Sequence, residues 1–269
     1  MKQIAILGAA GRMGKMLIRH IQSNAVPGLK LSGAVDLWDS PDRGKDAGVA
    51  AGVSPAGILI GADLKEVVGA CDVVIDFSGH NGTAGNAPRV AEAGKALVIG
   101  TTGLSADERK AVEAAAGKIP VVLASNMSLG MNLLFSLVEQ AAAVLKDKGY
   151  DIEIIERHHR RKKDSPSGTA ISLGEAAARG YDWDLKKVAV HGRDGLVGER
   201  PAQQIGFHAV RGGDIVGDHT VLFAADGECI ELSHRATSRD AFALGALRAA
   251  AWIAGRKPGL YSMRDVLGV

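Results

Sequence analysis

From residue 2 to about residue 120, short apolar runs alternate with longer stretches of helical periodicity, and this alternation restricts the fold more than any other feature. The runs are rich in Val, Ile and Leu and cover residues 4–7, 31–35, 73–77, 97–99 and 121–124. Strands separated by helices at this spacing form βαβ units, whose right-handed crossovers give a parallel sheet covered on both faces. We therefore expect an α/β chain that begins with a doubly wound, Rossmann-type domain.

The pattern changes after a long apolar helix that we expect at residues 128–146. Four runs with alternating polarity follow at residues 151–156, 203–210, 215–224 and 229–235. Residues 211–214 (RGGD) and 225–228 (ADGE) have the composition of hairpin turns. We expect an α+β domain with a mainly antiparallel sheet and a helix at about residues 167–179, then a last helix at residues 241–254.

Composition and charge exclude several classes of protein. Hydrophobic residues make up 46% of the chain and charged ones 23%, which is typical of a folded globular protein. No apolar stretch reaches the roughly 20 residues that cross a bilayer, and no secretory leader follows Met1, so we expect a cytoplasmic protein without a membrane span. Cys71 and Cys229 are too few for a disulfide framework or a metal cluster, and we expect both in the core. The net charge of +2 is small, so an acidic partner needs a local basic cluster.

A glycine-rich turn links the first apolar run to the first helix. Gly8 permits the tight turn, Gly11 lets the backbone approach a pyrophosphate, and Gly14 lets helix and strand pack closely. The spacing GxxGxxG is a variant of GxGxxG, and a tight turn without a ligand is the alternative explanation. Asp36 ends the second run about 20 residues further on, where a carboxylate accepts hydrogen bonds from ribose hydroxyls. We predict a nicotinamide dinucleotide site that includes Gly8, Ala9, Ala10, Gly11, Arg12, Met13 and Asp36.

The choice between the two nicotinamide dinucleotides depends on the charge near Asp36. A 2′-phosphate is repelled by this carboxylate, and the next residue is Leu37 rather than an Arg. We expect NADH to be used at least as well as NADPH, although Arg43 could weaken that preference. Further strand ends are expected to border the nicotinamide, namely Phe77, Ser78, Gly79, Gly100, Thr101, Thr102, Ala124, Ser125, Asn126 and Met127.

The densest set of chemically active side chains lies in ERHHRRKKDSPSGTA, residues 156–170. Residues 157–163 hold five Lys or Arg and two His. Such a run is often a solvated face or a nucleic-acid patch. Here Ser-Pro-Ser-Gly-Thr opens a helix, whose free N–H groups and positive dipole end bind anions such as carboxylates. A histidine in this setting can donate a proton as a hydride arrives, and the cations can stabilise developing negative charge.

Six segments resemble the dihydrodipicolinate reductase family, also described as 4-hydroxy-tetrahydrodipicolinate reductase, over essentially the whole chain. They are GAAGRMG at Gly8, IGTTG at Ile99, SNMSLGMN at Ser125, EIIERHHRRKKDSPSGTA at Glu153, GER at Gly198 and GDIVGDHT at Gly213. The resemblance implies an NAD(P)H-dependent enzyme of the diaminopimelate route to lysine. It would reduce (2S,4S)-4-hydroxy-2,3,4,5-tetrahydrodipicolinate to tetrahydrodipicolinate, with hydride moving from nicotinamide C4 to ring C4 as the hydroxyl is lost.

The resemblance also implies roles for individual residues. His158 matches the proton donor or acceptor and Lys162 the second catalytic residue. Expected substrate contacts are His159, Ser167, Gly168, Thr169 and Thr102. The family commonly has Arg after the acidic ribose-binding residue, and Leu37 departs from this. The family implies a homotetramer in which substrate-domain sheets meet. Its last helix returns to the dinucleotide domain, which would comprise residues 1–127 and 239–269, with residues 128–238 as the substrate domain.

Two other functions compete with this interpretation. A dinucleotide-sensing regulator would use the basic run on nucleic-acid phosphates, with salt-dependent DNA binding and no turnover. Another Rossmann dehydrogenase, acting on aspartate or homoserine, would have little use for paired His and Lys beside a helix N-terminus. We expect a small dicarboxylate as the partner, with no nucleic acid and no membrane.

Overall fold

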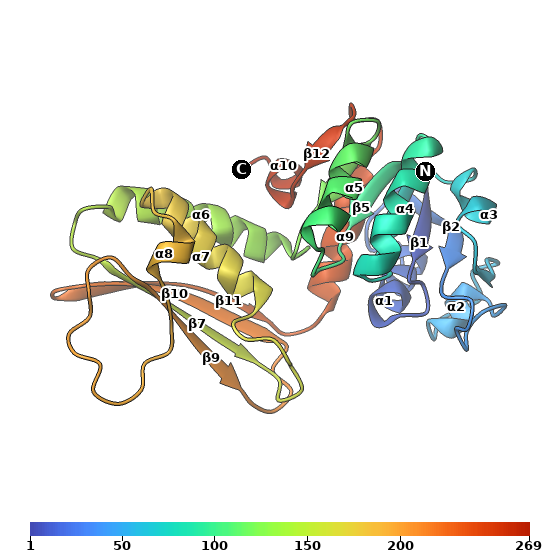
Figure 1. Cartoon of the computed structure of the whole chain (residues 1–269). Coiled ribbons are helices and arrows are strands. Elements are labelled where there is room, and N and C mark those ends of the chain that lie inside the picture. The colour runs from blue at the N-terminus through green and yellow to red at the C-terminus, as the bar shows by residue number, and fades with distance from the viewer. The chain divides into compact units, whose positions relative to one another are not determined.

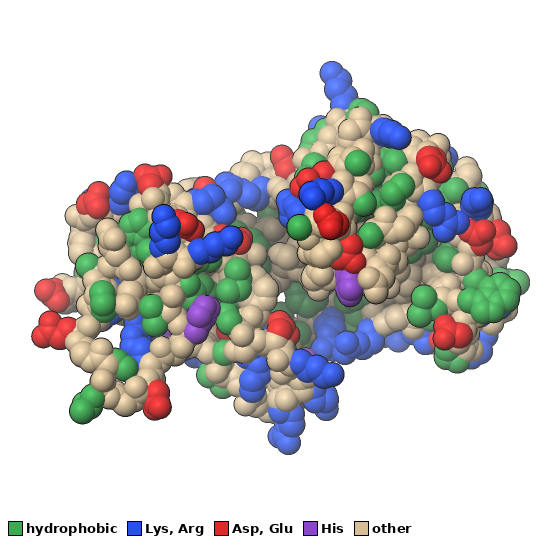
Figure 2. Space-filling view, viewed as in Figure 1, with side chains coloured by type: hydrophobic (Ala, Val, Ile, Leu, Met, Phe, Trp, Pro, Cys, Tyr) green, Lys and Arg blue, Asp and Glu red, His purple; other side chains and the backbone are tan.

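The computed structural model describes all 269 residues and divides the chain into two compact units, residues 1–129 with 240–268 and residues 130–239 (Figure 1). The chain thus crosses between units after residues 129 and 239, where the sequence placed the crossings after residues 127 and 238. None of the helices combines the length and the apolar character that a membrane span needs. Basic and acidic side chains both occur on the face shown in Figure 2, in keeping with the small net charge.

The first unit contains a seven-stranded sheet in the order β12-β6-β5-β4-β1-β2-β3, and every pair in it is parallel. Its strands are β1 (Lys2–Leu7), β2 (Leu29–Val35), β3 (Ile60–Gly61), β4 (Val73–Asp76), β5 (Ala96–Ile99), β6 (Pro120–Leu123) and β12 (Gly259–Tyr261). The strand order reverses between β1 and β4, which is the position where ligands bind in open parallel sheets. The doubly wound fold expected from the sequence is confirmed.

Helices cover both faces of this sheet, which is why the buried parts of its strands are largely apolar on both faces. Ile4 and Ile6 of β1 belong to the core shared with α1 and α9, whereas Ala5 and Leu7 belong to the core shared with α4 and α5. The helices of the unit are α1 (Arg12–Gln22), α2 (Ala47–Ala50), α3 (Lys65–Val68), α4 (His80–Glu92), α5 (Ala106–Ala116), α9 (Asp240–Ile253) and α10 (Met263–Leu267). The sequence did not predict the short strand β12, because three residues are too few to show a period.

The second unit contains a five-stranded mixed sheet in the order β11-β10-β7-β9-β8. Its strands are β7 (Asp151–His158), β8 (Ala189–His191), β9 (Ile205–Arg211), β10 (Gly217–Ala225) and β11 (Glu228–Ala236). Strand β10 is antiparallel to both its neighbours, while β9 is parallel to β7 and β8. Helices α6 (Leu129–Leu145) and α7 (Gly168–Gly180) share a core with this sheet, and α8 (Leu185–Val188) follows α7. The expected α+β class is confirmed, although the parallel pairs were not anticipated.

One of the two predicted hairpin turns is wrong. Residues 225–228 do close the β10–β11 hairpin, with Ala225 paired to Glu228. Residues 211–214 instead connect strands that are not neighbours, because β7 lies between β9 and β10. The Gly212 N–H donates to the His158 carbonyl (2.9 Å), so the glycine pair passes over the end of β7. Turn composition alone does not reveal a third strand inserted between two others.

The two cysteines occupy different environments. Cys71 is buried, as expected, and burial raises the pKa of its thiol to about 11. Cys229 is exposed, so its predicted core position is wrong. The reason is that β11 is the edge strand of its sheet, and most of its side chains are exposed.

Candidate active site

The carboxyl ends of five neighbouring strands bring the predicted dinucleotide residues into one row. The strand registers align the residues Val35, Leu7, Asp76, Ile99 and Leu123. The residues that directly follow them are Asp36, Gly8, Phe77, Gly100 and Ala124. Four of these five were predicted to touch the dinucleotide, and the fifth, Phe77, lies at a strand end expected to border it. The row crosses the position where the strand order reverses.

The glycine turn has the close backbone approach that its spacing predicted. Gly8 has a φ of +76°, and its N–H donates to the Val35 carbonyl (2.9 Å). A Cβ on Gly14 would lie 2.2 Å from the Gly8 carbonyl oxygen, so helix α1 packs against the turn too closely for a side chain. No side chain caps the start of α1 at Gly11. Its first N–H groups and its positive dipole end therefore remain suited to a phosphate.

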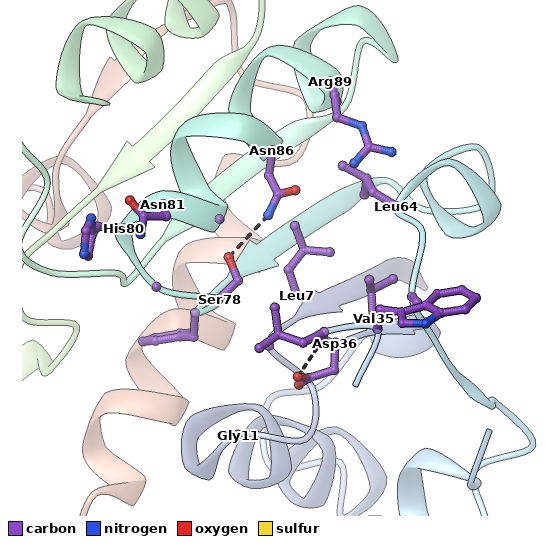
Figure 3. Close-up of a pocket in the computed structure, with 17 residues that line it drawn as sticks. Leu7, Gly11, Val35, Asp36, Leu64, Ser78, His80, Asn81, Asn86 and Arg89 are labelled. Carbon is purple, nitrogen blue, oxygen red and sulfur yellow. Dashed lines mark hydrogen bonds between the residues drawn. The ribbon is translucent and has the colours of Figure 1, made fainter. Parts of the chain in front are cut away.

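Asp36 fixes the turn as well as bordering the pocket (Figure 3). Its Oδ2 accepts a hydrogen bond from the Ala10 N–H (2.6 Å), and its Oδ1 accepts one from the Leu37 N–H (2.8 Å). The carboxylate therefore ties the glycine turn to the end of β2. Arg12 and Met13 form the first residues of α1 directly beyond this turn.

A pocket of about 630 Å³ lies beside the row. Several of its side chains were not singled out by the sequence analysis, namely Trp38 from the loop after β2 and His80, Asn81, Asn86 and Arg89 from α4. The Arg43 guanidinium stacks 3.4 Å from the centre of the Trp38 ring. Trp38 and the residues of α4 are far apart in the sequence, so only the fold brings them together.

The strand ends expected to border the nicotinamide are held by close packing and by hydrogen bonds. A Cβ on Gly100 would lie 2.1 Å from the Phe77 ring, which lines the pocket. The Thr101 Oγ1 accepts from Thr83 Oγ1 (2.9 Å). Thr102 is exposed beside it. These contacts join the segment after β5 to Phe77 and to α4.

The segment after β6 completes the edge of the sheet. The Ala124 N–H donates to the Ile99 carbonyl (3.2 Å), and the Asn126 side chain accepts from the Ser128 N–H (2.9 Å). Helix α9 packs so closely that a Cβ on its Gly245 would lie 1.7 Å from the Met127 carbonyl oxygen. Ser125 lies between these fixed points. All the predicted dinucleotide residues therefore belong to one edge of the first unit.

In the second unit, His158 is the last residue of β7 and is buried. It lies on the same face of the strand as Ile152, Ile154 and Glu156, because burial alternates along β7. The His158 Nδ1 and the Glu156 Oε2 are 2.6 Å apart. The predicted proton-transfer residue is therefore held by a buried carboxylate from its own strand.

Glu156 is bound on both oxygens by other partners. The Arg211 guanidinium donates to each oxygen (2.7 Å both), and the Ser167 N–H donates to Oε1 (3.0 Å). Burial opposes the charge, but the hydrogen bonds from His158, Arg211 and Ser167 outweigh it and lower the pKa of Glu156 to about 2. The carboxylate is therefore ionised at neutral pH.

The predicted anion-binding end of α7 adjoins this carboxylate. Ser167 caps the helix, with its Oγ accepting from the Ala170 N–H (3.2 Å), and Gly168 and Thr169 form the first turn. The Ser167 Oγ is also 3.1 Å from the His219 Nε2. Burial lowers the pKa of His219 to about 3, so this imidazole is neutral at pH 7.

The remaining predicted residues lie on the loop between β7 and α7. The Lys162 Nζ pairs with the Asp164 Oδ2 (2.9 Å), and the Lys162 N–H donates to the His159 carbonyl (3.1 Å). Burial and the nearby Arg239 and Arg161 lower the pKa of His159, which favours its neutral form. The structure thus brings His158, His159, Lys162, Ser167, Gly168 and Thr169 to one end of the second unit, while Thr102 belongs to the first unit.

Sequence reasoning missed three residues that surround His158. Glu156, Arg211 and His219 were not assigned to the site, although the motif that contains Glu156 was recognised. Alternation along β7 carries a usable signal, because it puts an acid on the face occupied by Ile152 and Ile154. A buried acid needs partners, and a histidine two residues later faces the same side.

The first unit has a glycine turn, an acidic residue at the end of β2 and a pocket where the strand order reverses, and the second has a histidine and a lysine near a helix N-terminus. These features define a nicotinamide-dependent oxidoreductase built from two units. The chain belongs to the dihydrodipicolinate reductase family. The family described as "Dihydrodipicolinate reductase, N-terminus" matches residues 2–127, and "Dihydrodipicolinate reductase, C-terminus" matches residues 130–267.

Relatives from several bacteria support this assignment. A 4-hydroxy-tetrahydrodipicolinate reductase from Anaeromyxobacter dehalogenans is 51% identical over 269 residues, which cover 100% of this chain and 98% of the relative. One from Alkalilimnicola ehrlichii is 52% identical over 267 residues, covering 99% of each chain. The similarity is therefore not confined to one unit.

Solved structures agree on the fold. A dipicolinate-bound dihydrodipicolinate reductase from Paenisporosarcina sp. TG-14 superposes with a TM-score of 0.74 at 23% identity, covering 98% of each chain. A probable dehydrogenase from Thermotoga maritima gives a TM-score of 0.63 at 13% identity, covering 98% of this chain and 92% of that one. At these identities the likeness concerns the fold alone.

Proposed function

We propose that the chain reduces (2S,4S)-4-hydroxy-2,3,4,5-tetrahydrodipicolinate with NADH or NADPH, giving tetrahydrodipicolinate, NAD(P)⁺ and water. One observation carries the proposal. A histidine, a lysine and an anion-binding helix N-terminus lie together in a chain that is about half identical to reductases of this name along its whole length. The step belongs to the diaminopimelate route to lysine, and the substrate is a small dicarboxylate.

The first unit fits a nicotinamide dinucleotide. The Gly8 carbonyl leaves no room for a side chain on Gly14, and no side chain caps α1, so the N–H groups at the start of α1 are suited to the pyrophosphate. Asp36 borders the pocket, where its carboxylate is suited to the ribose hydroxyls. Residues 8–13, Asp36, 100–102 and 124–127 would hold it. When bound, the reduced nicotinamide supplies a hydride to C4 of the substrate ring.

The residues of the second unit would bind the substrate and balance its charge. The hydride replaces the hydroxyl at C4, and a proton combines with the departing hydroxyl to form water, so the reaction consumes one proton. His158 would hold that proton, and Lys162 would stabilise negative charge near the reacting centre. The N–H groups at Ser167, Gly168 and Thr169, together with His159 and Thr102, would bind the carboxylates.

The preference between nucleotides is a testable part of the proposal. We expect NADH to give a kcat/KM at least equal to that of NADPH, because Asp36 repels a 2′-phosphate and Leu37 offers no cation beside it. Arg43 is stacked on Trp38 and donates to its carbonyl (3.4 Å), which holds its charge at that ring. Measuring both efficiencies on one preparation tests this. An advantage for NADPH of about a hundredfold would contradict the prediction.

Substitutions in the glycine turn separate folding from dinucleotide binding. Gly14→Ala should destabilise the first unit by about 1–3 kcal/mol, because its methyl group meets backbone atoms of Gly8 and Ala9. Gly11→Ala is the matched control, since its Cβ meets only the Gly8 oxygen, at 3.1 Å, and its φ of −70° suits alanine. It should keep its melting temperature and still bind NADH more weakly. Denaturant unfolding and NADH titration measure both effects, and equal melting temperatures for the two variants would contradict the prediction.

An assay of NADH oxidation tests the function itself. The purified chain is given freshly generated hydroxytetrahydrodipicolinate, and aspartate and homoserine precursors serve as the comparison. Turnover only with the first substrate supports the proposal. Turnover only with an amino-acid substrate would favour the other Rossmann dehydrogenases, and salt-dependent DNA binding without turnover would favour a regulator.

The proposal extends to assembly and location. We propose a homotetramer formed through the second unit, as the family resemblance implies. The exposed edge strand β11 supports a role for this sheet in assembly, because an uncovered edge is suited to contact with another chain. We place the protein in the cytoplasm, where the route to lysine would run.

A further inference from the structure

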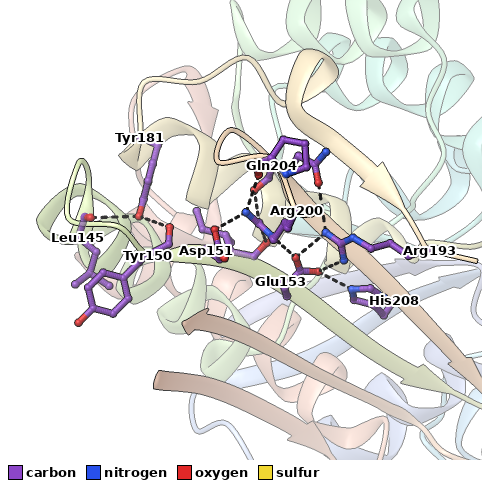
Figure 4. A network of polar contacts seen from close by, with 11 residues as sticks. Leu145, Tyr150, Asp151, Glu153, Tyr181, Arg193, Arg200, Gln204 and His208 are labelled. Atoms are coloured by element: carbon purple, nitrogen blue, oxygen red, sulfur yellow. Dashed lines mark hydrogen bonds and ion pairs between the residues drawn. The ribbon is translucent and has the colours of Figure 1, made fainter. Parts of the chain in front are cut away.

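Two glutamates of β7 have similar partners but lie in different places. Glu153 is bound by Arg193 and Arg200 and by the His208 Nε2 at 2.6 Å, as Figure 4 shows. Through the two arginines it holds the loop between β8 and β9 against the sheet. Glu156 also has an arginine and a histidine, but its histidine is His158. The same kind of carboxylate therefore has two possible roles on one strand.

The surroundings of Glu156 are more constrained than a structural ion pair needs. Its side chain is 1% exposed, and three groups donate to its two oxygens. Arg211 also donates to the carbonyls of Asp164 (2.8 Å) and Val210 (2.8 Å), so the guanidinium that holds the carboxylate is itself held. A carboxylate bound in this way keeps one orientation.

This orientation decides which nitrogen of His158 is available. The carboxylate oxygen Oε2 of Glu156 is a hydrogen-bond acceptor beside Nδ1. In the neutral imidazole the proton therefore resides on Nδ1, and Nε2 carries the lone pair. Gly217 on β10 lies beside that second nitrogen, and a Cβ there would be 3.0 Å from Nε2. A glycine at this position keeps a side chain away from the nitrogen that would exchange a proton.

The same carboxylate links the imidazole to the helix that would bind the substrate. Its Oε1 accepts from the Ser167 N–H at the N-cap of α7, while Oε2 binds His158. One rigid group therefore sets the position of the imidazole relative to the anion-binding end of the helix. A displacement of either is transmitted to the other through a carboxylate of fixed geometry.

We propose that Glu156 is a positioning residue, which fixes the tautomer and orientation of His158 and holds it in register with the N-terminus of α7. The proposal rests on the proposed function, in which His158 holds the proton of the reduction. Glu156 stabilises the protonated imidazole by its negative charge, and this contribution is distinct from its part in folding.

Other charged and titratable groups also lie near His158. Arg211 comes from β9, and His219 comes from β10, with its ring centre 5.1 Å from that of His158. The loop between β7 and α7 contributes His159 and Lys162, and the charge of His234 on β11 helps to lower the pKa of His219. Glu156 is the carboxylate bound directly to His158, so its replacement removes the negative charge nearest the imidazole.

The test compares Glu156→Gln, Glu156→Asp and the matched control Glu153→Gln in the full chain. Glu156→Gln should lower kcat by about a hundredfold or more, with KM for NADH changed less than about twofold. Glu156→Asp keeps the charge and should restore part of the lost rate. Glu153→Gln should keep kcat within about threefold of the wild type.

Two kinetic results would overturn the proposal. One is a Glu156→Gln variant with kcat within about threefold of the wild type. The other is an equal loss in Glu156→Gln and Glu153→Gln, which would indicate damage to the sheet in general.

A second measurement needs neither substrate nor a folded Glu156 variant. Nitrogen-15 NMR of the wild-type imidazoles, with His158 assigned by comparison with His158→Ala, reports the tautomer directly. The Nδ1–H form supports the proposal and the Nε2–H form overturns it. If the chain fails to reduce the proposed substrate, the proposed function is lost while this spectrum still decides the role of Glu156.

Discussion

Replacing His158 with Ala should lower kcat by about a hundredfold to ten-thousandfold, which is the usual range for the loss of a group that transfers a proton. The physical reason is that the hydroxyl leaves as water only if a proton accompanies the hydride. His158 is buried at the end of β7 with its Nδ1 2.6 Å from the Glu156 Oε2, and this is the imidazole that would hold the proton. Steady-state kinetics at saturating NADH and substrate measure the effect.

A histidine in a similar setting serves as the control. The His208 Nε2 is also 2.6 Å from a glutamate oxygen, the Oε2 of Glu153. His208 belongs to β9, where it is in register with Ile155 and not with His158. His208→Ala should therefore keep kcat within about threefold of the wild type. Unchanged turnover in His158→Ala would remove His158 from its proposed role, and parallel losses in both variants would indicate a structural effect.

Replacing Lys162 with Ala should lower kcat by about a hundredfold and raise KM for the substrate by about tenfold. A cation near the reacting centre attracts the dianionic substrate and also stabilises charge that develops during the reaction, so both constants change. Asp164 now pairs with the Lys162 Nζ at 2.9 Å and keeps the ammonium close to the loop. A substrate carboxylate would compete for the same ammonium.

The neighbouring Lys163 provides the matched control for Lys162. It has the same charge and chain length and is exposed on the same loop. Lys163→Ala should change both constants by less than about threefold, because exposed charges are screened by water and salt. If the two lysine variants behave alike, the effect is one of overall charge and the specific role of Lys162 is wrong.

The fold of the first unit could be predicted largely from local patterns. The strands that precede Gly8, Asp36, Gly100 and Ala124 end in buried apolar runs, because both faces of the parallel sheet are covered. Their ends then lie at one edge by the rules of βαβ connection. The pocket residues Trp38 and those of α4 were not predictable, since only the three-dimensional path of the loops brings them together.

The second unit was harder to predict from sequence. The basic run and the Ser-Pro-Ser-Gly-Thr helix start were visible, and Ser167 does cap α7. The insertion of β7 between β9 and β10 was not, because strand order in a mixed sheet depends on long-range pairing. Arg211 and His219 reach His158 from those two neighbouring strands, so the environment of the histidine depends on the part of the fold that local patterns do not specify.

A crystal structure of the chain with NADH and dipicolinate tests the central claim most directly. We predict that the dicarboxylate binds at the N-terminus of α7, with the His158 imidazole and the Lys162 ammonium within hydrogen-bond distance of it and the nicotinamide against its ring. A ligand bound elsewhere, or these two side chains directed into bulk solvent while dinucleotide and dicarboxylate are both bound, would contradict the account.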